Sequence, residues 1–462
     1  MIILEIKKAK GAIIVFTLVF GTIFLMLLGA LTGFALFQAR LSEESIAREM
    51  AFQIAEAGLN FARWHLNHWP DNFSFGGEYD FKNPEGEIIG KYRLTVEAPT
   101  PCNPGTKIIT EGWTLTFPEK KRKIQAIYAK PALTKYAFLT NANVWFGPDE
   151  ELKGPFHSNG GIRMDGEQNS LATSAKQTYI CGPEHGCSPP QEKPGIWGQG
   201  EGALKGLWQF PVPPLDFNSI TQDLAQLKAA AQGSGLYLPE NPLGYHLKFR
   251  NNGTVDIYRV TRLKSPVWGY DGNQWIWESN DIDQESFLQT YTLSAFCAPI
   301  YVESNVWVEG DYKGKVTVVA AKLPEMPSSL KKIIISGNIN MVDNNSALGL
   351  IAQKDILIPL YSPDNLEIKA ALIAQKGHIF RYYYPKWSFE PYRTYAIRTK
   401  IETFGAMATN TMWTFTWVNS QNQVVSGYRT TEMSYNPNLT FSPPPYFPVS
   451  GEPEMINWDE IQ

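Results

Sequence analysis

Residues 11–37 read GAIIVFTLVFGTIFLMLLGALTGFALF, a stretch without a charged residue or a proline. At about 1.5 Å per helical residue, the stretch would span roughly 40 Å, more than the roughly 30 Å hydrocarbon core of a bilayer. A secretory signal peptide has a shorter apolar region and a small-residue cleavage site after it, which residues 37–40 (FQAR) do not provide. The sequence therefore predicts a transmembrane helix.

The charges that flank this stretch predict its orientation. Lys7, Lys8 and Lys10 precede it, whereas Arg40 on the other side is followed by Glu43 and other acidic residues. The positive-inside rule therefore places the N-terminus in the cytoplasm and the remaining body of the chain on the far side of the membrane.

The apolar stretch continues into an amphipathic one. Neither a proline nor a glycine cluster interrupts residues 38–69, and Pro70 ends the helical pattern. Apolar residues recur there at three- and four-residue steps and form one predicted stripe, made of Ile46, Met50, Ile54, Ala57, Phe61 and Trp64. We expect one helix of roughly 58 residues, half of it in lipid and half of it in water.

Two short stretches resemble a known family. Residues 8–16, KAKGAIIVF, with the apolar helix after them, resemble the N-terminus of type IV pilins and type II secretion pseudopilins. Residues 55–59, AEAGL, resemble a stretch of PilX-type minor pilins. The resemblance implies that prepilin peptidase cuts after Gly11 and methylates Ala12, so that residues 1–11 are a leader. It also implies that the helix inserts in a bacterial inner membrane and packs against other pilins.

One position departs from the pattern of major pilins. The fifth mature residue of major subunits is a glutamate, which neutralises a neighbour's N-terminal amine, and it is Phe16 in this chain. An acid inside the membrane is costly unless it is paired, and a chain without it cannot offer that contact. The family members that lack the glutamate start or cap the fibre, so the resemblance implies a minor pilin at the tip of a pilus or a secretion pseudopilus.

The length and composition indicate a large β-rich body. The chain has 462 residues, a net charge of −4, 14 tryptophans, 21 tyrosines and 37 glycines, which is typical of strands and turns. We expect an α+β protein in which a pilin helix is followed by a small antiparallel sheet, a β module and a C-terminal β segment with a proline-rich, extended tail outside any core. The respective ranges are 12–70, 71–131, 132–400 and 401–462. In the sheet, strands are expected at residues 78–81, 90–97, 107–117 and 122–129.

An internal repeat predicts the architecture of the β module. Residues 349–356, GLIAQKDI, recur as ALIAQKGHI at 371–379, and weaker echoes occur at 156–160, 318–322 and 406–410. A period of about twenty residues fits one coil of a parallel β-solenoid, in which turn asparagines or glutamines could form a hydrogen-bond ladder. A β-sandwich with similar strands is the alternative. A helix-and-hairpin insertion is expected near residues 215–280, with a helix over 215–232 and turns at Asn252-Gly253 and Asp271-Gly272.

The cysteines and glycines suggest structural roles. Cys181 and Cys187 bracket a loop rich in glycine and proline, for which a local disulfide is favoured over a metal site that would lack a fourth ligand. Whether Cys102 and Cys297 are paired stays open. Gly29 and Gly33 form a Gly-x-x-x-Gly spacing that lets membrane helices approach closely, although glycine is also common in such helices.

No motif of an enzyme, cofactor or metal site is recognisable, and we expect neither catalysis nor a cofactor. Asp281 and Asp283 are the nearest candidate pair of carboxylates, but residues 278–281 look like a loop. The basic run 120–123, KKRK, fits a solvated hairpin tip, and we expect no nucleic-acid partner. The aromatic residues at 381–392 fit either a surface for glycan or protein, or packing between coils.

Three hypotheses follow for the function. The first is a minor pilin that primes or caps a fibre and presents the β module at its tip. The second is a surface protein that remains anchored in the membrane and binds a glycan or a partner. The third is a glycan-active enzyme, which would need Asp281 or Asp283 in a cleft.

Overall fold

The structure, a computed structural model, describes residues 12–461 except 149, 218, 294–296, 420, 422 and 450–451. The chain forms two compact units. Unit 1 contains the residues up to 98, residues 106–128 and those from 455 onward, and unit 2 contains residues 99–105 and 129–454. The module boundaries that the sequence predicts at residues 131 and 400 remain predictions.

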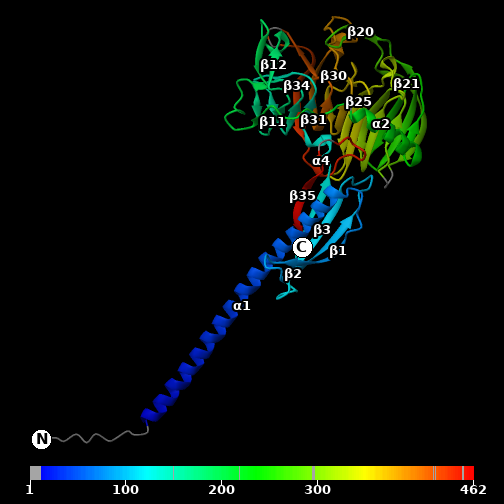
Figure 1. Cartoon of the computed structure of the whole chain (residues 1–462). Coiled ribbons are helices and arrows are strands. Elements are labelled where there is room, and N and C mark those ends of the chain that lie inside the picture. The colour runs from blue at the N-terminus through cyan, green and yellow to red at the C-terminus, as the bar shows by residue number, and fades with distance from the viewer. Residues whose placement is uncertain are drawn as a thin grey trace, which may run out of the picture. The chain divides into compact units, whose positions relative to one another are not determined.

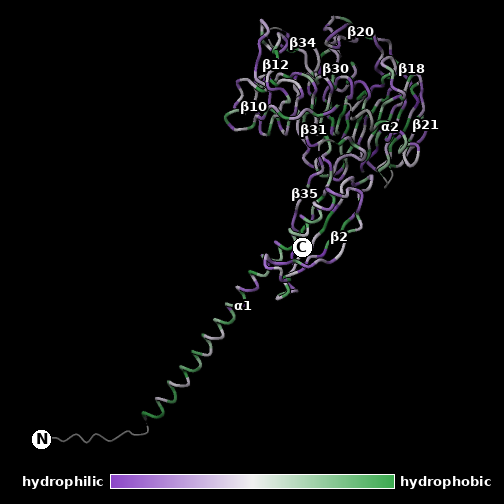
Figure 2. Tube along the Cα trace, viewed as in Figure 1, coloured by the Kyte–Doolittle hydropathy of each residue, from purple (hydrophilic) through white to green (hydrophobic). Residues whose placement is uncertain are grey.

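Unit 1 is built on the helix α1 (Ala12–His68), which runs for 57 residues without a break. This confirms the prediction of one continuous helix. The backbone N–H of Trp69 still bonds to the carbonyl of His65 at 2.8 Å, and Pro70 follows, where the helical pattern was expected to end. Figure 2 shows that hydrophobic colour dominates the half of α1 nearer the N-terminus and that polar residues appear in the other half.

A sheet of five strands completes unit 1, in the order β1-β2-β3-β4-β35. Figure 1 shows β1, β2, β3 and β35 beside α1. The bounds are β1 (Gly77–Lys82), β2 (Ile88–Glu97), β3 (Thr106–Thr114), β4 (Arg122–Ala129) and β35 (Glu454–Ile461). The first four strands form the antiparallel meander that the sequence predicts. The fifth was not predicted, because its polar sequence, EMINWDEI, was taken as part of the tail.

Unit 2 is mostly β-structure, and one long row of strands organises it. Neighbours in the row pair in parallel: β16 (Leu236–Leu238), β22 (Ile300–Val302), β24 (Lys315–Ala320), β26 (Ala347–Ala352), β29 (Ala371–Ala374), β31 (Ile397–Thr409), β5 (Phe138–Thr140), β8 (Phe156–Ser158), β11 (Ala172–Ser174) and β15 (Trp208–Gln209). The chain enters this row in its middle, at β5, proceeds to one end at β15, and returns from the other end at β16.

Further strands pair parallel to one another in other rows of unit 2. One row is β17 (Tyr245–Arg250), β23 (Val306–Tyr312), β25 (Ile333–Met341), β27 (Ile356–Ile358), β30 (Ile379–Arg381) and β32 (Trp413–Thr414). Another is β25, β28 (Asn365–Ile368), β31 and β34 (Val424–Tyr435). Two short rows are β6 (Val144–Phe146), β9 (Ile162–Met164) and β14 (Ile196–Trp197), and β7 (Glu151–Leu152) with β10 (Glu167–Gln168).

Antiparallel pairs and short helices complete unit 2. The pairs are β12 (Thr178–Cys181) with β13 (Gln191–Pro194), β18 (Thr254–Leu263) with β17 and β21 (Ile282–Thr292), β19 (Val267–Tyr270) with β20 (Trp275–Glu278), and β33 (Thr416–Val418) with β34. The helices are α2 (Ser219–Gly233), α3 (Tyr392–Tyr395), α4 (Asn438–Phe441) and the 3-10 turns Leu133–Lys135, Pro183–His185 and Pro327–Ser329. Both predicted hairpin turns, at residues 252–253 and 271–272, join paired strands.

The core of unit 2 lies on both sides of the long row, which explains the apolar runs in the sequence. Strands β26 and β29 are buried at every position, as expected for parallel strands that are covered on both faces. Leu350 and Leu372, which are register partners, belong to one cluster, and their neighbours Ile351 and Ile373 belong to another. The predicted repeat therefore corresponds to two strands that stack in register.

The prediction of a β-solenoid is met only in its coarser part, a large and mostly β unit. Parallel and antiparallel pairs coexist, and the main network of pairings closes on itself as a barrel does. The prediction of a tail outside any core is wrong. Phe447 is buried in the second cluster, and the carbonyl of Pro445 accepts a hydrogen bond from the buried Thr317 hydroxyl.

Candidate assembly helix and candidate sites of the β unit

The first half of α1 is long and apolar enough to cross a membrane, judged by its length and composition. Its large apolar side chains are exposed around the whole circumference, from Ile13 to Phe37. Its hydroxyls need no external partner, since Thr17 and Thr22 donate to the carbonyls of Ile13 and Leu18 at 2.8 and 3.0 Å. A helix whose polar groups are satisfied internally is compatible with lipid on every side.

The predicted processing site lies at the start of this helix. Gly11 is outside the described residues, and Ala12 is the first residue of α1. Phe16, where major pilins carry a glutamate, is 62% exposed, and its ring lies 6.4 Å from that of Phe20. The first charged residue of the described helix is Arg40, so residues 12–39 offer no carboxylate to a neighbouring amine.

Gly29 and Gly33 lie four residues apart on one face of α1. A Cβ added to either glycine would meet no atom of the described chain within 4 Å. Their face is therefore a shallow strip that another helix can approach closely.

The half of α1 in unit 1's core packs through small residues, and the predicted apolar stripe lies only partly in this core. Ile54 is buried, but Ile46 and Trp64 are 61% and 49% exposed. The buried face of α1 is turned by about one residue from the predicted apolar stripe. It consists of Ala47, Ala51, Ile54, Ala55, Gly58, Leu59, Ala62 and Leu66. This leaves Ile46 and Trp64 as apolar side chains outside the core of unit 1.

Close approach between helix and sheet explains this choice of residues. A Cβ on Gly112 of β3 would lie 2.4 Å from the carbonyl oxygen of Ala51, and one on Gly90 of β2 would lie 2.5 Å from Cδ1 of Ile54. A Cβ on Gly58 would lie 2.7 Å from the ring of Tyr92. In the AEAGL stretch, Ala55 and Gly58 thus serve the packing of α1 on its own sheet.

The basic run at residues 120–123 faces acidic residues of unit 1. Lys120 lies 2.9 Å from Glu44 of α1, and Lys121 and Lys123 lie 3.3 and 3.9 Å from Glu111. Arg122 pairs with Glu460 of β35. These pairs divide the positive charge among acidic partners, as expected of a solvated hairpin tip.

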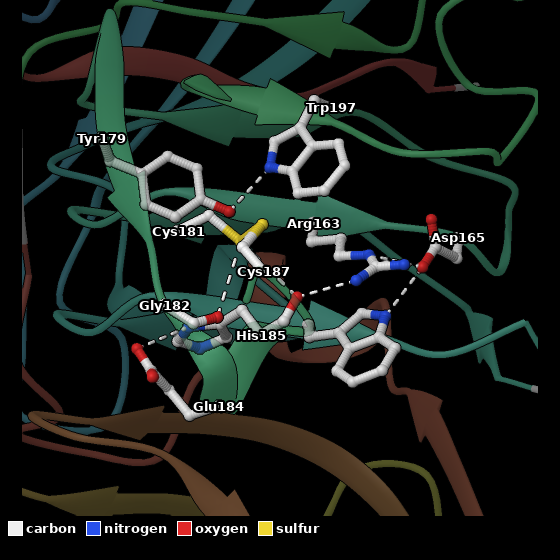
Figure 3. Close-up of a disulfide and its surroundings, with 10 residues drawn as sticks. Arg163, Asp165, Tyr179, Cys181, Gly182, Glu184, His185, Cys187 and Trp197 are labelled. Atoms are coloured by element: carbon white, nitrogen blue, oxygen red, sulfur yellow. Dashed lines mark hydrogen bonds and ion pairs between the residues drawn. A yellow bond between two sulfur atoms is a disulfide. The ribbon is translucent and has the colours of Figure 1, made fainter. Parts of the chain in front are cut away.

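A disulfide holds the loop that follows β12 (Figure 3). The Sγ atoms of Cys181 and Cys187 are 2.06 Å apart. Arg163 of β9 fixes this loop, since its guanidinium donates to the carbonyl of His185 at 2.8 Å and to Asp165 at 2.7 Å (Figure 3). The guanidinium carbon also lies 4.4 Å from the ring centroid of Trp145. Cys102 and Cys297, left open by the sequence, form a second disulfide in unit 2.

A small pocket of about 200 Å³ lies beside this loop, lined in part by Trp145, His185, Met412 and Trp413. Within the described residues, no group of three or more His, Cys, Asp or Glu side chains could hold a metal ion. The pocket has aromatic walls, one imidazole and two glutamates, Glu150 and Glu184.

Asp281 and Asp283, the candidate carboxylate pair, line a cleft of about 350 Å³ together with His246, Glu285 and Ser336. Asp283 is not in a loop but in β21, a strand that the sequence did not predict. Arg262 pairs with its carboxylate. The cleft thus meets one condition of the enzyme hypothesis, the placement of both aspartates.

The charged side chains of the cleft form a network of ion pairs and hydrogen bonds. Burial raises the pKa of Asp281 to about 6. Burial also acts to raise the pKa of Glu285, but hydrogen bonds from His246 and Lys248, both at 2.7 Å, lower it to about 2. Ser336 Oγ lies 3.3 Å from His246 Nε2 and 3.2 Å from Glu309 Oε2. The carboxylate of Glu309 lies beside Ser336 and would oppose negative charge on a carbonyl attacked there.

The aromatic run at residues 381–392 divides between packing and exposure. Tyr382, Tyr384 and Tyr392 are buried, whereas Trp387 and Phe389 are exposed. The fully buried Arg381 donates from Nη1 to the carbonyl of Ala396 at 3.0 Å and from Nη2 to those of Leu360 and Tyr395 at 3.1 and 2.6 Å. Most of the run therefore holds the rows of unit 2 together.

The polar turns of the long row form the hydrogen-bond ladder that the sequence predicts. Asn141 donates to Asn410 Oδ1 at 2.9 Å, and Asn159 donates to Asn141 Oδ1 at 2.9 Å. The buried Gln353 adds a further bond, from Nε2 to the carbonyl of Lys322 at 3.1 Å. Each bond joins turns of neighbouring strands, so side chains as well as backbone fix the stacking register.

Comparisons with known proteins add little to this description. The competence-associated pilin ComZ from Thermus thermophilus is similar at a TM-score of 0.34 and 12% identity, over 90% of this chain and 97% of that chain. A TM-score of this size does not establish a common fold. No protein-family model matches the chain, and no curated protein matches it.

Proposed function

We propose that the chain is a minor-pilin-like structural protein that primes or caps a type IV pilus or a related secretion pseudopilus and presents unit 2 at its tip. The observation that carries this proposal is the helix α1. Its first half is uncharged and bare on all sides, and it continues without a break into a half that packs on its own sheet. Such a helix can be held first by lipid and then by the helices of other subunits.

The position at the tip is supported by two features. Phe16 removes the carboxylate that a subunit inside the fibre would offer to its neighbour's amine. Unit 2 comprises residues 99–105 and 129–454, which is a large body for a thin fibre to accommodate along its side. We interpret the in-register parallel pairs of unit 2 as the coils of a β-solenoid, in which each coil buries its apolar residues against the next.

The proposed role is structural rather than catalytic. In the cleft, Asp283 pairs with Arg262, and Glu285 accepts hydrogen bonds from His246 and Lys248. The proposed partners are other pilins, prepilin peptidase and the inner membrane. In this proposal the N-terminus is cytoplasmic before assembly and the body is outside the membrane. The alternative function is a surface protein that keeps its anchor, which the same helix would also support.

Processing of the N-terminus distinguishes the two functions. In cells that carry prepilin peptidase, we expect mass spectrometry of the purified protein to find a mature chain that begins at a methylated Ala12. Substituting Gly11→Leu should block this cleavage, whereas Gly21→Leu, a matched glycine change inside the helix, should not. An uncut chain in the presence of an active peptidase would refute the pilin proposal and favour the anchor.

Helix packing gives a second test. Gly29→Leu with Gly33→Leu should lower the amount of protein in the sheared fibre fraction at least fivefold, because the side chains fill the strip that a neighbouring helix approaches. Gly21→Leu is again the control, since a Cβ there also meets no atom of the described chain within 4 Å. Equal amounts of all variants in the fibre fraction would show that this strip is not a packing face.

A further inference from the structure

The hairpin β19–β20 carries four aromatic side chains on one face. Trp268 is the register partner of Trp277, and Tyr270 is that of Trp275. Alternate residues of a strand share a face, so these four rings lie together. The sequence signal is the alternation WGY and WIW on the two arms of the Asp271-Gly272 turn, which sequence reasoning treated only as a hairpin.

The opposite face of this hairpin is already in use. A Cβ added to Gly269 would lie 2.8 Å from Tyr382, so the backbone of β19 lies directly on that ring. Val267 is buried, and Ile276 packs against the same cluster as Tyr382. The aromatic face therefore points away from the core and is not available to cover it.

The rings on the outer face are exposed and closely spaced. Trp268, Trp275 and Trp277 are 40%, 50% and 54% exposed. The ring centroids of Trp268 and Trp277 are 5.2 Å apart, and those of Tyr270 and Trp275 are 5.5 Å apart. Leaving so much aromatic area in water is unfavourable, and clustered exposure of this kind marks a binding surface.

Two further rings extend the surface and are held in place by the backbone. Tyr383 exchanges two backbone hydrogen bonds of 3.0 Å with Tyr270, and its ring lies 5.9 Å from that of Trp275. Trp417 donates from Nε1 to the carbonyl of Arg381 at 2.9 Å, and its ring lies 6.0 Å from that of Tyr383. We call the six residues Trp268, Tyr270, Trp275, Trp277, Tyr383 and Trp417 the aromatic platform.

The composition of the platform restricts its ligand. It contains no aliphatic side chain and no cation, and the residues of the hairpin that carry charge at neutral pH are Asp271 and Glu278. Glu278 is held by Lys332 and Tyr382. A nucleic acid strand would find rings to stack on but no cation for its phosphates within the hairpin. The exposed amides of Asn273 and Gln274 lie at the turn beside the rings.

We propose that the aromatic platform binds a neutral carbohydrate chain. A sugar ring presents a face of C–H bonds that packs on an indole or phenol ring, and its hydroxyls can bond to the amides at the turn. Several fixed rings in a row would bind successive sugars with little loss of side-chain entropy. The proposal deepens the proposed function by naming the class of ligand that unit 2 would bind. It rests on the proposed function only for the place of binding, the tip of the fibre.

Binding can be measured on the detergent-purified full chain, apart from any fibre. The probes are dextran, laminarin, galactomannan and xylan in affinity electrophoresis, with quenching of tryptophan fluorescence as the second readout. We expect at least one of the four to retard the wild-type chain, and Trp268→Ala with Trp277→Ala to weaken that binding at least tenfold. Trp458→Ala, whose side chain in unit 1 is 48% exposed, should bind as the wild type does.

Two further variants separate stacking from simple apolar contact. Trp268→Tyr with Trp277→Tyr keeps ring faces and should retain binding within about threefold, whereas the corresponding double leucine variant should lose it. The proposal is overturned if none of the four polysaccharides retards the wild type, if the alanine or leucine variants bind normally, or if single-stranded DNA binds through these rings instead. Unfolding curves that match the wild type show that the variants fold. Cleavage at Gly11 and recovery in fibres are scored separately, so a failure of this proposal is distinct from a failure of the assembly role.

Discussion

A Cβ added to Gly58 would lie 2.5 Å from Oγ1 of Thr110, so helix α1 and strand β3 meet at a separation that glycine alone allows at this position. Thr110 is fully buried and Gly58 is also buried. Neither residue can therefore move aside into solvent when a side chain is added.

Gly58→Ala should therefore destabilise unit 1. Overpacking of a well-packed core costs about 1–3 kcal/mol, against which the better helix propensity of alanine returns about 1 kcal/mol. We expect a net loss of up to about 2 kcal/mol in the free energy of unfolding, measured by denaturant titration in detergent. Gly33→Ala, in the same helix but with no described atom within 4 Å of the new Cβ, should not lower it. Equal stability of the two variants would contradict this packing.

The two disulfides should differ in their contribution to unit 2. The bond Cys102–Cys297 spans 195 residues, whereas Cys181–Cys187 spans 6. In the chain-entropy account, such loops correspond to about 5 and about 2 kcal/mol respectively. Double serine variants compared by denaturant unfolding should show the larger loss for Cys102 and Cys297. A larger loss for the short loop would mean that local contacts, rather than loop length, dominate.

The buried carboxyl of Asp281 should make unit 2 less stable as the pH rises. Its pKa is raised from 3.8 to about 6 in the folded chain, so the folded state binds more protons between these values. Its contribution is complete below pH 4 and is lost as the pH approaches 6. Asp281→Asn keeps a neutral side chain, so its advantage over the wild type should grow across this window to about 3 kcal/mol.

Glu285 provides the control of opposite sign for this pH dependence. Its pKa is lowered from 4.5 to about 2, so its contribution is present above pH 4.5 and is lost as the pH falls toward 2. Glu285→Gln should therefore destabilise the chain at neutral pH, and the deficit should shrink in acid. If the stability difference from the wild type changed with pH in the same direction for both variants, the two carboxyls would not lie in opposite environments.

Arg381 should be among the most sensitive positions of unit 2. Its guanidinium is fully buried and donates to three backbone carbonyls, and its pKa is lowered by burial. Arg381→Met would remove this donor from the carbonyls of Leu360 and Tyr395, whereas that of Ala396 keeps the N–H of Gly427 at 2.9 Å. We expect a loss of about 3 kcal/mol or more in denaturant unfolding. Arg262→Met, at an ion pair whose arginine is 59% exposed, should cost less than about 1 kcal/mol. Similar losses in the free energy of unfolding for both variants would show that burial does not determine how much each arginine contributes to stability.

Sequence patterns predicted the elements whose periodicity is strong. They did not predict which residues of α1 contact the sheet, because close packing determines those residues. The uninterrupted pattern to Trp69 predicted α1 almost to the residue. The predicted stripe followed the large apolar side chains, such as Ile46 and Trp64. The sheet instead packs on alanines and Gly58, because close approach needs small residues that a hydrophobicity pattern undervalues.

The same contrast holds in unit 2. The repeat at residues 349 and 371 predicted two strands that pair in register. The turn asparagines Asn159 and Asn410 belong to a ladder through Asn141, a residue that the sequence did not single out. Strand β21 was missed because its exposed side chains, IDQESFLQTYT, lack an apolar alternation. Its pairing with β18 gives it strand structure, and no local pattern reports that pairing. The aromatic platform was missed because its six residues come from three separate segments of the chain.

The entry of the chain into the middle of the long row has a consequence for its synthesis. Asn141, beside β5, has its ladder partner Asn410 269 residues further along the chain. Until that later segment has been made, the early strands from β5 to β15 present an open backbone edge on the β5 side, and such edges invite pairing with other chains. Nascent chains truncated before β31 should therefore aggregate, and a holding chaperone would be needed until the two halves of the row have joined.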